Sequence, residues 1–347
     1  MSSNPLPFLV AFGLLGILFS QIGCQTPSRE ADSPSPKSSP NATNPQNQKS
    51  SKPDTRKFTK IVTGLGHACV LDNQRRVLCT TPMYTSGDER PNAPDDQFVD
   101  IAAGGSFSCG IRTDHRIVCW GYVPFGWGNV PFGNLKKTQG DTGVLPRKEP
   151  RRSPPGRFRQ IDAHISTLCA INVDGEPTCW GGGGGELFIM PMKPHLTDIS
   201  VGLHHVCGIT KSGTVECWGD TELGQSEAAS GSFTSIDVGD YSSWAVSSSG
   251  SLRCWGVWPY TANQPCSPPD GVYRDIVAGK NHACGVKEDG RLTCWGPGEN
   301  DNDEFPSGRV ISIDANKEGW CAILESGEPY CWGWWPKTKP FGPDESE

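Results

Sequence analysis

Cysteine is the residue type in this chain whose spacing could support chemistry, because 15 cysteines occur among its 347 residues. Disulfides, metal ligation and buried free thiols are the three roles open to such side chains. Zinc sites prefer closely spaced cysteine pairs that histidine completes, so a wide and uniform spacing favours disulfides. One spacing recurs here, with the second cysteine of each pair ten residues after the first: Cys69 and Cys79, Cys109 and Cys119, Cys169 and Cys179, Cys207 and Cys217, Cys284 and Cys294, and Cys321 and Cys331.

The segment between two paired cysteines is typical of a β-hairpin. From Cys207 to Cys217, a three-residue loop at the centre pairs the two cysteines and leaves Gly213 third in the loop. A type I turn followed by a bulge needs a positive φ there, which glycine adopts at little cost. Arg75 and His115 occupy this place in the first two repeats, so we expect those turns to be strained or differently built. Four other repeats have glycine there, namely Gly175, Gly250, Gly290 and Gly327.

Two cysteines that face each other across such a hairpin can form a disulfide. Counted from the turn, they fall on a non-hydrogen-bonded site, where Cα atoms lie about 4.5 Å apart. Each bridge closes a loop of about 11 residues and stabilises the fold by less than about 3 kcal/mol. Trp244 stands where the partner of Cys254 would be, so we predict a bridge between Cys254 and Cys266.

A register that recurs seven times after residue 57 predicts the fold. Each copy has Ile three residues after a strand-like start, and the first cysteine or Trp244 follows eight residues later. With 42 Gly, 30 Pro and no long stretch of helical periodicity, the composition favours short strands joined by turns. We therefore predict an all-β, seven-bladed β-propeller over residues 58–335, with three or four strands in each blade. An open array of repeats is the structural alternative.

Residues 1–23 have the features of a bacterial lipoprotein signal peptide. An apolar run precedes a small residue and Cys24, which in such signals is lipidated and becomes the mature N-terminus. Plain secretion and a retained signal anchor are the alternatives. Residues 24–57 are rich in Ser and Pro and are expected to form a disordered tether, and residues 336–347 form a C-terminal tail. We expect an exported protein of the cell envelope, attached at the outer membrane or the cell surface.

The repeat resembles that of the regulator of chromosome condensation family. Its clearest copy is NHACGVKEDGRLTCWG, from Asn281 to Gly296, and the resemblance covers residues 58–335. Departures from the pattern include Thr80 in place of Trp, and His164 and Asn316 in place of Gly. The resemblance implies a seven-bladed fold that binds other macromolecules. Relatives include an exchange factor for a small GTPase, kinase-associated scaffolds and a secreted propeller that inhibits β-lactamases.

No catalytic group of residues stands out in the sequence. It lacks the nucleophile-elbow, zinc-hydrolase and phosphate-loop motifs. His67, His205 and His282 each stand two residues before the first cysteine of a repeat, which marks a structural position rather than a metal ligand or a base. We therefore expect no enzyme, no cofactor and no metal. The formal net charge of −7 argues against nucleic acid as a partner.

A long insertion after the second repeat, residues 122–156, is the candidate binding site. Its first part is aromatic and its second part is basic, and aromatic residues beside arginine are typical of interface hot spots. A solvated loop without a partner is the alternative. The partners that fit are a protein, an acidic envelope polymer or lipid headgroups. The candidate binding residues are Tyr122, Phe125, Trp127, Phe132, Lys136, Lys137, Arg147, Lys148, Arg151 and Arg152.

Taken together, these features predict a monomeric, non-enzymatic binding or scaffold protein that is anchored in the cell envelope and uses propeller loops for protein contacts. Inhibition of a secreted enzyme such as a β-lactamase is a second hypothesis. Guanine-nucleotide exchange is a third, and export would separate such an activity from cytosolic GTPases.

Overall fold

The computed structural model describes residues 56–80, 93–121, 155–181, 194–258, 264–297, 305–316 and 319–333. The expected signal peptide with Cys24, the tether, the C-terminal tail and the ten candidate binding residues from Tyr122 to Arg152 lie outside these ranges. Among the residues that are described, no helix is long and apolar enough to cross a membrane.

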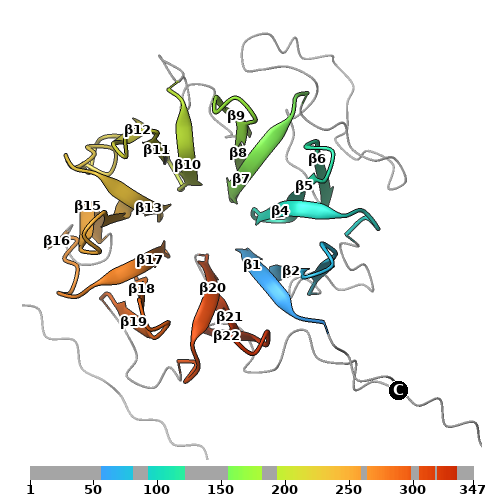
Figure 1. The fold of residues 1–347 in the computed structure, drawn as a ribbon. Helices are drawn as coiled ribbons and strands as arrows, with labels where there is room; N and C mark the ends of the chain where they lie inside the picture. Colours follow the sequence, from blue (N-terminus) through green and yellow to red (C-terminus); the bar gives the residue numbers. More distant parts are fainter. Residues whose placement is uncertain are drawn as a thin grey trace, which may run out of the picture. The chain divides into compact units, whose positions relative to one another are not determined.

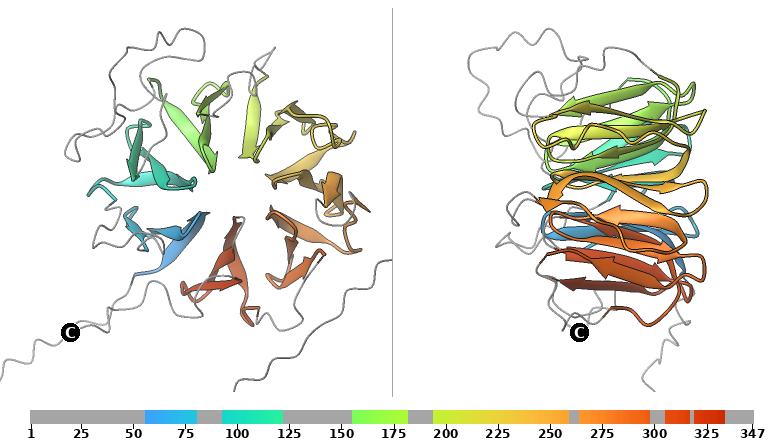
Figure 2. Two further views of the ribbon diagram at one scale, coloured as in Figure 1. Left: turned by 180° about the vertical axis from the view of Figure 1, so that it is seen from behind. Right: turned by 90° about the vertical axis from the view of Figure 1, so that its left-hand side faces the viewer.

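Seven antiparallel sheets make up the described fold, and each takes its strands from one stretch of chain. The first strand of each sheet is innermost and the sheets are arranged radially, which confirms the seven-bladed, all-β propeller (Figures 1 and 2). Blade 1 contains β1 (Phe58–Gly64), β2 (His67–Asp72) and β3 (Val77–Cys79); blade 2 contains β4 (Phe98–Ala103), β5 (Phe107–Arg112) and β6 (Ile117–Gly121); blade 3 contains β7 (Phe158–His164), β8 (Thr167–Asn172) and β9 (Pro177–Gly181); blade 4 contains β10 (Leu196–Val201), β11 (His205–Thr210) and β12 (Val215–Gly219); blade 5 contains β13 (Phe233–Val238), β14 (Ser242–Ser247), β15 (Leu252–Trp258) and β16 (Gln264–Pro265); blade 6 contains β17 (Tyr273–Ala278), β18 (Ala283–Lys287) and β19 (Leu292–Trp295); blade 7 contains β20 (Val310–Ala315), β21 (Gly319–Leu324) and β22 (Pro329–Gly333).

Every inner strand has one irregularity, directly after its first residue. In β10, Leu196 pairs with Thr210 and Asp198 pairs with Ile209, so Thr197 is an extra residue that has no opposite residue in β11. The same shift of register occurs in the other six inner strands. Such a bulge bends the strand and redirects a side chain. The extra residue is exposed in all seven blades, and the regular alternation resumes behind it.

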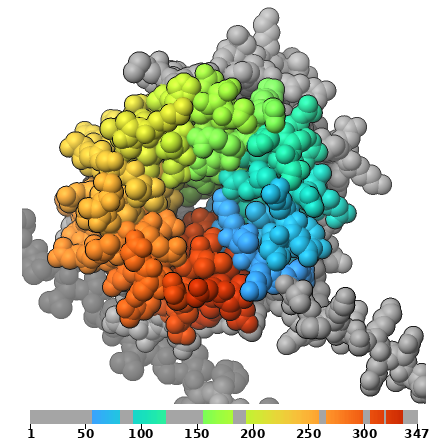
Figure 3. Space-filling model, in the orientation of Figure 1, coloured from blue at the N-terminus to red at the C-terminus, as the bar shows by residue number. Residues whose placement is uncertain are grey.

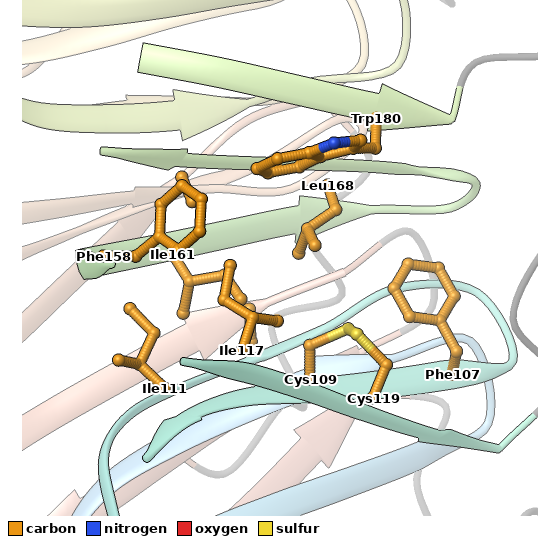
Figure 4. Close-up of a cluster of buried hydrophobic side chains, with 11 residues drawn as sticks. Phe107, Cys109, Ile111, Ile117, Cys119, Phe158, Ile161, Leu168 and Trp180 are labelled. Carbon is orange, nitrogen blue, oxygen red and sulfur yellow. A yellow bond between two sulfur atoms is a disulfide. The ribbon is translucent and has the colours of Figure 1, made fainter. Parts of the chain in front are cut away.

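The hydrophobic core consists of seven layers, one between each pair of neighbouring blades. In the layer between blades 2 and 3, the disulfide of Cys109 and Cys119 faces Trp180 of the next blade, with Leu168 and Ile161 beside them (Figure 4). Five of the seven layers pack a disulfide of one blade against the tryptophan that follows the second cysteine of the next blade. The disulfides therefore contribute apolar volume to the blade interfaces as well as closing their own hairpins.

All six predicted hairpin bridges are present, with Cα atoms of the paired cysteines 4.0 to 4.1 Å apart. The predicted pairing of Cys207 with Cys217 is also the register of the sheet. The two turns without glycine have the same form as the others, because Arg75 and His115 adopt φ of 64° and 70°. Of the two expectations for these turns, strain rather than a different build is confirmed, because a residue with a side chain pays a free-energy cost for a positive φ.

Blade 5 departs from the repeat in its disulfide. Trp244 is fully buried where the first cysteine would stand, and its ring lies 5.5 Å from that of Trp295 in blade 6. A tryptophan thus fills the volume of the missing bridge in this layer. Cys254 pairs instead with Cys266, as predicted, and their Cα atoms lie 6.1 Å apart. This bridge holds the short strand β16 against β15.

The ring closes between blades 7 and 1 without exchange of a strand, because each of these blades is made of its own consecutive strands. Among the described residues, the core layer at this seam contains Cys321 and Cys331 but no tryptophan, and Thr80 stands at the tryptophan position of blade 1. Thr80 instead accepts a hydrogen bond from the backbone N–H of Ala68, 2.8 Å away, and Leu78 packs against the layer.

Near the centre the blades approach each other closely, and Figure 3 shows how little space remains there. A Cβ atom added to Gly202 would lie 2.4 Å from the carbonyl oxygen of Gly239, and one on Gly239 would lie 2.4 Å from that of Gly279. No side chain fits at such distances, so glycine at the ends of the inner strands allows the ring to close.

Candidate functional site

Two positions in each inner strand, eleven of the fourteen occupied by polar residues, form a belt around the centre of the ring. They are the residues immediately before and after the buried isoleucine of the strand. Six of the fourteen are aspartates and one is a lysine. The belt comprises Lys60 and Val62, Asp100 and Ala102, Gln160 and Asp162, Asp198 and Ser200, Ser235 and Asp237, Asp275 and Val277, and Ser312 and Asp314.

The first tier of the belt, before the isoleucine, joins side chains of neighbouring blades. Lys60 forms an ion pair with Asp100, and Gln160 donates a hydrogen bond to Asp198. The hydroxyl of Ser235 donates to Asp275 over 2.9 Å. These bonds cross the interfaces between blades 1 and 2, 3 and 4, and 5 and 6.

The second tier, after the isoleucine, binds backbone N–H groups of the following blade. Asp162 accepts from the N–H of Val201 at 2.7 Å, and Asp237 accepts from that of Ala278 at 2.6 Å. Each carboxylate therefore satisfies a backbone donor of an inner strand that has no neighbouring strand on that side. The belt functions as a set of connectors between blades.

The carboxyl groups of the belt are crowded and poorly hydrated. Removal from water raises the pKa of Asp198 to about 6, although the hydrogen bond from Gln160 opposes the rise. It likewise raises the pKa of Asp314 to about 7 against the hydrogen bonds from Thr63, and the carboxylate of Asp162 adds to the rise. Burial also raises the pKa of Asp237 well above its usual value. The described residues contain no group of three or more His, Cys, Asp or Glu suited to a metal ion.

Two of the three recurring histidines are buried and connect blades. The Nε2 of His67 lies 2.8 Å from the hydroxyl of Ser108, and that of His205 lies 2.8 Å from Ser243. Burial lowers the pKa of His67 to about 4 and that of His205 to about 3. Both rings are therefore neutral at pH 7, which supports the structural position inferred from the sequence. His282 lies at the same place in blade 6 but is only half-buried.

One contact near the centre joins two blades that are not neighbours in the ring. His164 at the end of β7 lies 3.1 Å from Asp240, which follows β13, so the pair joins blade 3 to blade 5. The neighbouring Ile165 has φ of 40°, a strained value for a β-branched residue. In the sequence, the only sign of this contact is that His164 replaces the glycine usual at this position of the repeat.

A cavity of about 330 Å³ lies beside blade 1, between its outer hairpin and the segment that leads to β4. Phe58, Val77 and Leu78 form its apolar wall. Arg76 at its edge forms an ion pair with the buried Asp72. Its lining includes the basic side chains of Arg56 and Arg76 and the carboxylates of Asp72, Asp95 and Asp96. These residues do not form a recognisable catalytic arrangement.

The predicted binding insertion is connected to this framework at both ends. It follows β6 of blade 2 and precedes β7 of blade 3, next to the core layer of Figure 4. The positions of its ten candidate residues lie outside the described residues, so their role stays a prediction.

Comparison with known proteins identifies the repeat. The model of the regulator of chromosome condensation (RCC1) repeat matches residues 98–122, 196–225 and 273–304. These three stretches begin with the inner strands of blades 2, 4 and 6.

Solved structures with this fold include plant receptors and a yeast regulator. The ectodomain of the Arabidopsis thaliana receptor kinase ACR4 is 23% identical, with a TM-score of 0.60 over 80% of this chain and 96% of that chain. That of the Physcomitrella patens receptor kinase CR4 is 21% identical, with a TM-score of 0.60 over 80% of this chain and 73% of that chain. Prp20p of Saccharomyces cerevisiae, described with its binding to Gsp1p and histones, is 18% identical, with a TM-score of 0.52 over 70% and 73%. At these identities the likeness concerns the fold.

Proposed function

Because the chain is a propeller built of regulator of chromosome condensation repeats, we propose that it is a non-enzymatic binding or scaffold protein of the bacterial cell envelope. The observation that carries the proposal is a ring whose buried aspartates hold neighbouring blades together. Asp162, Asp237 and Asp314 each bind backbone N–H groups of the next blade. Function is then left to the loops, which on rigid scaffolds commonly carry binding.

Seven disulfides support export, because such bonds form and persist in oxidising compartments. In the proposed mature protein Cys24 carries a lipid and residues 24–57 form a tether between the envelope and the propeller. Substitution Cys24→Ala tests this anchor. We expect radioactive palmitate to label the natural chain and not the variant, and an unlabelled natural chain would contradict the anchor.

The insertion at residues 122–156 is the proposed partner-binding loop. Its ends belong to adjacent blades that share the Cys109 to Cys119 bridge and Trp180 in one core layer. The two blades thus provide a packed base for the ends of the insertion, and loops on such scaffolds commonly carry binding.

The test is to shorten this loop to the length of the 13-residue connection between β12 and β13, residues 220–232. The control variant shortens the 14-residue connection between β9 and β10, residues 182–195, by about half. Both variants and the full chain are used to capture proteins from isolated envelopes, which are then quantified by mass spectrometry. We expect a partner that the full chain and the control retain and the variant at 122–156 loses. Equal retention by all three would contradict the proposed loop.

A further inference from the structure

Two residues per blade lie exposed where the inner strand begins, on what we call the strand-start face. One precedes the first buried residue of the strand, and the other is the bulged residue that follows it. The fourteen residues are Lys57 and Thr59, Gln97 and Val99, Arg157 and Arg159, His195 and Thr197, Ser232 and Thr234, Val272 and Arg274, and Arg309 and Ile311.

The charge of this set is opposite to that of the chain. Five of its fourteen residues are Lys or Arg and none is Asp or Glu, whereas the whole chain has 31 basic and 38 acidic residues. The belt behind it, in the same strands, holds six aspartates and one lysine. The inner strands thus present cations to solvent on this face and keep their carboxylates inside.

The bulge directs two of the arginines across blade boundaries. Arg159 of blade 3 donates hydrogen bonds to the carbonyl oxygens of Leu196 and Thr197 in blade 4. Arg274 of blade 6 donates to the carbonyl oxygen of Val310 in blade 7. Because carbonyl oxygens are neutral, these bonds orient the guanidinium groups without cancelling their charge.

Few carboxylates neutralise this face. Within the described residues, Lys57 and Arg157 form no ion pair, and Arg309 has a pair with Glu325 at 3.6 Å in which both side chains are about 60% exposed. An exposed pair of this kind is weak. Two carboxylates of the hairpin turns are paired with arginines of their own turns, Asp114 with Arg112 and Asp289 with Arg291.

Exposed apolar side chains lie among the cations, most densely on blades 6 and 7. Val272 is 58% exposed and Ile311 is 45% exposed. The guanidinium of Arg274 donates to the carbonyl oxygen of Val310. Val310 stands between Arg309 and Ile311 in the sequence, so Arg274 lies close to both. Two arginines and an aliphatic side chain therefore adjoin each other here, and arginine is one of the residue types enriched at interface hot spots.

We propose that the strand-start face, centred on Val272, Arg274, Arg309 and Ile311, binds an acidic protein segment that also carries apolar side chains. Charge complementarity favours an acidic partner, and the exposed Val and Ile favour a polypeptide over a uniformly charged polymer. This inference rests on the proposed binding function and adds the class of partner and a second surface, apart from the 122–156 loop.

The experiment uses the full chain and a fluorescent peptide in which glutamate and leucine alternate, with binding followed by anisotropy. Comparison peptides replace either every glutamate by glutamine or every leucine by serine. We expect the first peptide to bind most tightly, and both replacements and added salt to weaken it.

The variant Arg309→Gln with Ile311→Ser should bind the peptide roughly tenfold more weakly than the natural chain. The matched control is Arg116→Gln with Val173→Ser, which removes one exposed cation and one 43% exposed aliphatic residue from the hairpin turns of blades 2 and 3, away from the centre on blades 6 and 7. We expect the control to bind like the natural chain. Equal binding by both variants would overturn the proposal. Equal binding of the serine peptide would also overturn it, since it would indicate a general polyanion.

The chain with the shortened 122–156 loop separates this inference from the proposed function. It should keep its affinity for the peptide, because the proposed face is centred on blades 6 and 7 whereas the loop connects blades 2 and 3. If that chain loses the peptide while the face variant keeps it, the inference fails and the proposed loop stands. If the face variant loses the peptide and the loop fails its capture test, only the loop is contradicted.

Discussion

The seam between blades 7 and 1 and the interface between blades 3 and 4 meet the same packing requirement in different ways. Between blades 3 and 4, Trp218 lies over the bridge of Cys169 and Cys179. At the seam, Thr80 takes the place of the tryptophan, and no tryptophan of the described residues covers the bridge of Cys321 and Cys331. Burial of apolar surface therefore stabilises the interface of blades 3 and 4 more than it stabilises the seam.

Hydrogen bonds join the blades at the seam, as they also do between blades 3 and 4. The Oδ2 of Asp314 accepts from the N–H of Thr63 at 2.6 Å and from its hydroxyl at 2.7 Å. Asn316 donates to the carbonyl of Gly64 at 2.6 Å, and the N–H of Ile61 donates to Ser312 at 3.3 Å. Apolar packing is non-directional, whereas hydrogen bonds fix position. The seam thus keeps its directional contacts while it loses apolar cover, and these contacts fix the register of the first and last blades.

The largest predicted effect concerns the tryptophan layer. Trp218→Ala should lower the free energy of unfolding by about 3 to 5 kcal/mol, because it leaves a cavity over a disulfide. Thr80→Ala, the same position at the seam, should cost about 1 kcal/mol through loss of the acceptor for Ala68. Denaturant unfolding under oxidising conditions measures both. Equal losses at the two sites would show that the seam is packed like the other interfaces.

The next effect concerns the polar contacts of the seam. Asp314→Ala should cost about 2 kcal/mol, because the N–H and the hydroxyl of Thr63 lose their acceptor in a confined site. Exchange of the Thr63 amide hydrogen should accelerate more than that of amides in blade 4. Asp289→Ala, in an exposed turn, is the control and should change neither quantity. Unchanged protection of Thr63 would mean that the hydrogen bonds do not hold the seam.

A smaller effect is the dependence of the seam on pH. A folded-state pKa of about 7 for Asp314 lies above the value of a free carboxyl group, so its stabilising contribution is lost as pH rises through 7. We expect stability to fall by about 1 kcal/mol between pH 6 and 8 from this group. Asp314→Asn should reduce that slope, and thermal unfolding at the two pH values measures it. A slope unaffected by this substitution would assign the titration elsewhere in the belt.

The smallest effect concerns the hairpin turn of blade 1. Arg75→Gly should stabilise the protein by about 0.5 to 1 kcal/mol, because glycine tolerates a φ of 64°. Gly213→Ala, at the same turn position of blade 4 with φ of 83°, should destabilise by a similar amount. The midpoints of denaturant unfolding compare the two. Stabilisation in neither case would indicate that the turn geometry carries little strain.

The periodic sequence was sufficient to predict the blades. The constant spacing of Cys207 and Cys217, and the break at Trp244, predicted the hairpin bridges and the bridge of Cys254 to Cys266, and all are present. Local pairing depends on residues close in sequence, which is why one repeat was enough to infer it.

Contacts between blades could not be inferred in this way. Asp314 and Thr63 are 251 residues apart, and nothing in either residue indicates the other. His164 and Asp240 meet across an intervening blade, so neither the repeat nor its departures named the pair. The exposure of Arg274 depends on a bulge that shifts the register by one residue, which the alternation of residue types does not reveal.

The self-contained construction of each blade has a consequence for how the chain acquires its disulfides. Fourteen cysteines can pair wrongly in very many ways, but each correct partner here is only 10 or 12 residues away. Short loops close quickly and at little entropic cost, so correct partners meet more often than wrong ones. Each hairpin can be oxidised before its neighbours exist, and the chain needs little reshuffling of misformed bridges. A ring of this kind can therefore mature in the order of its sequence, one blade at a time.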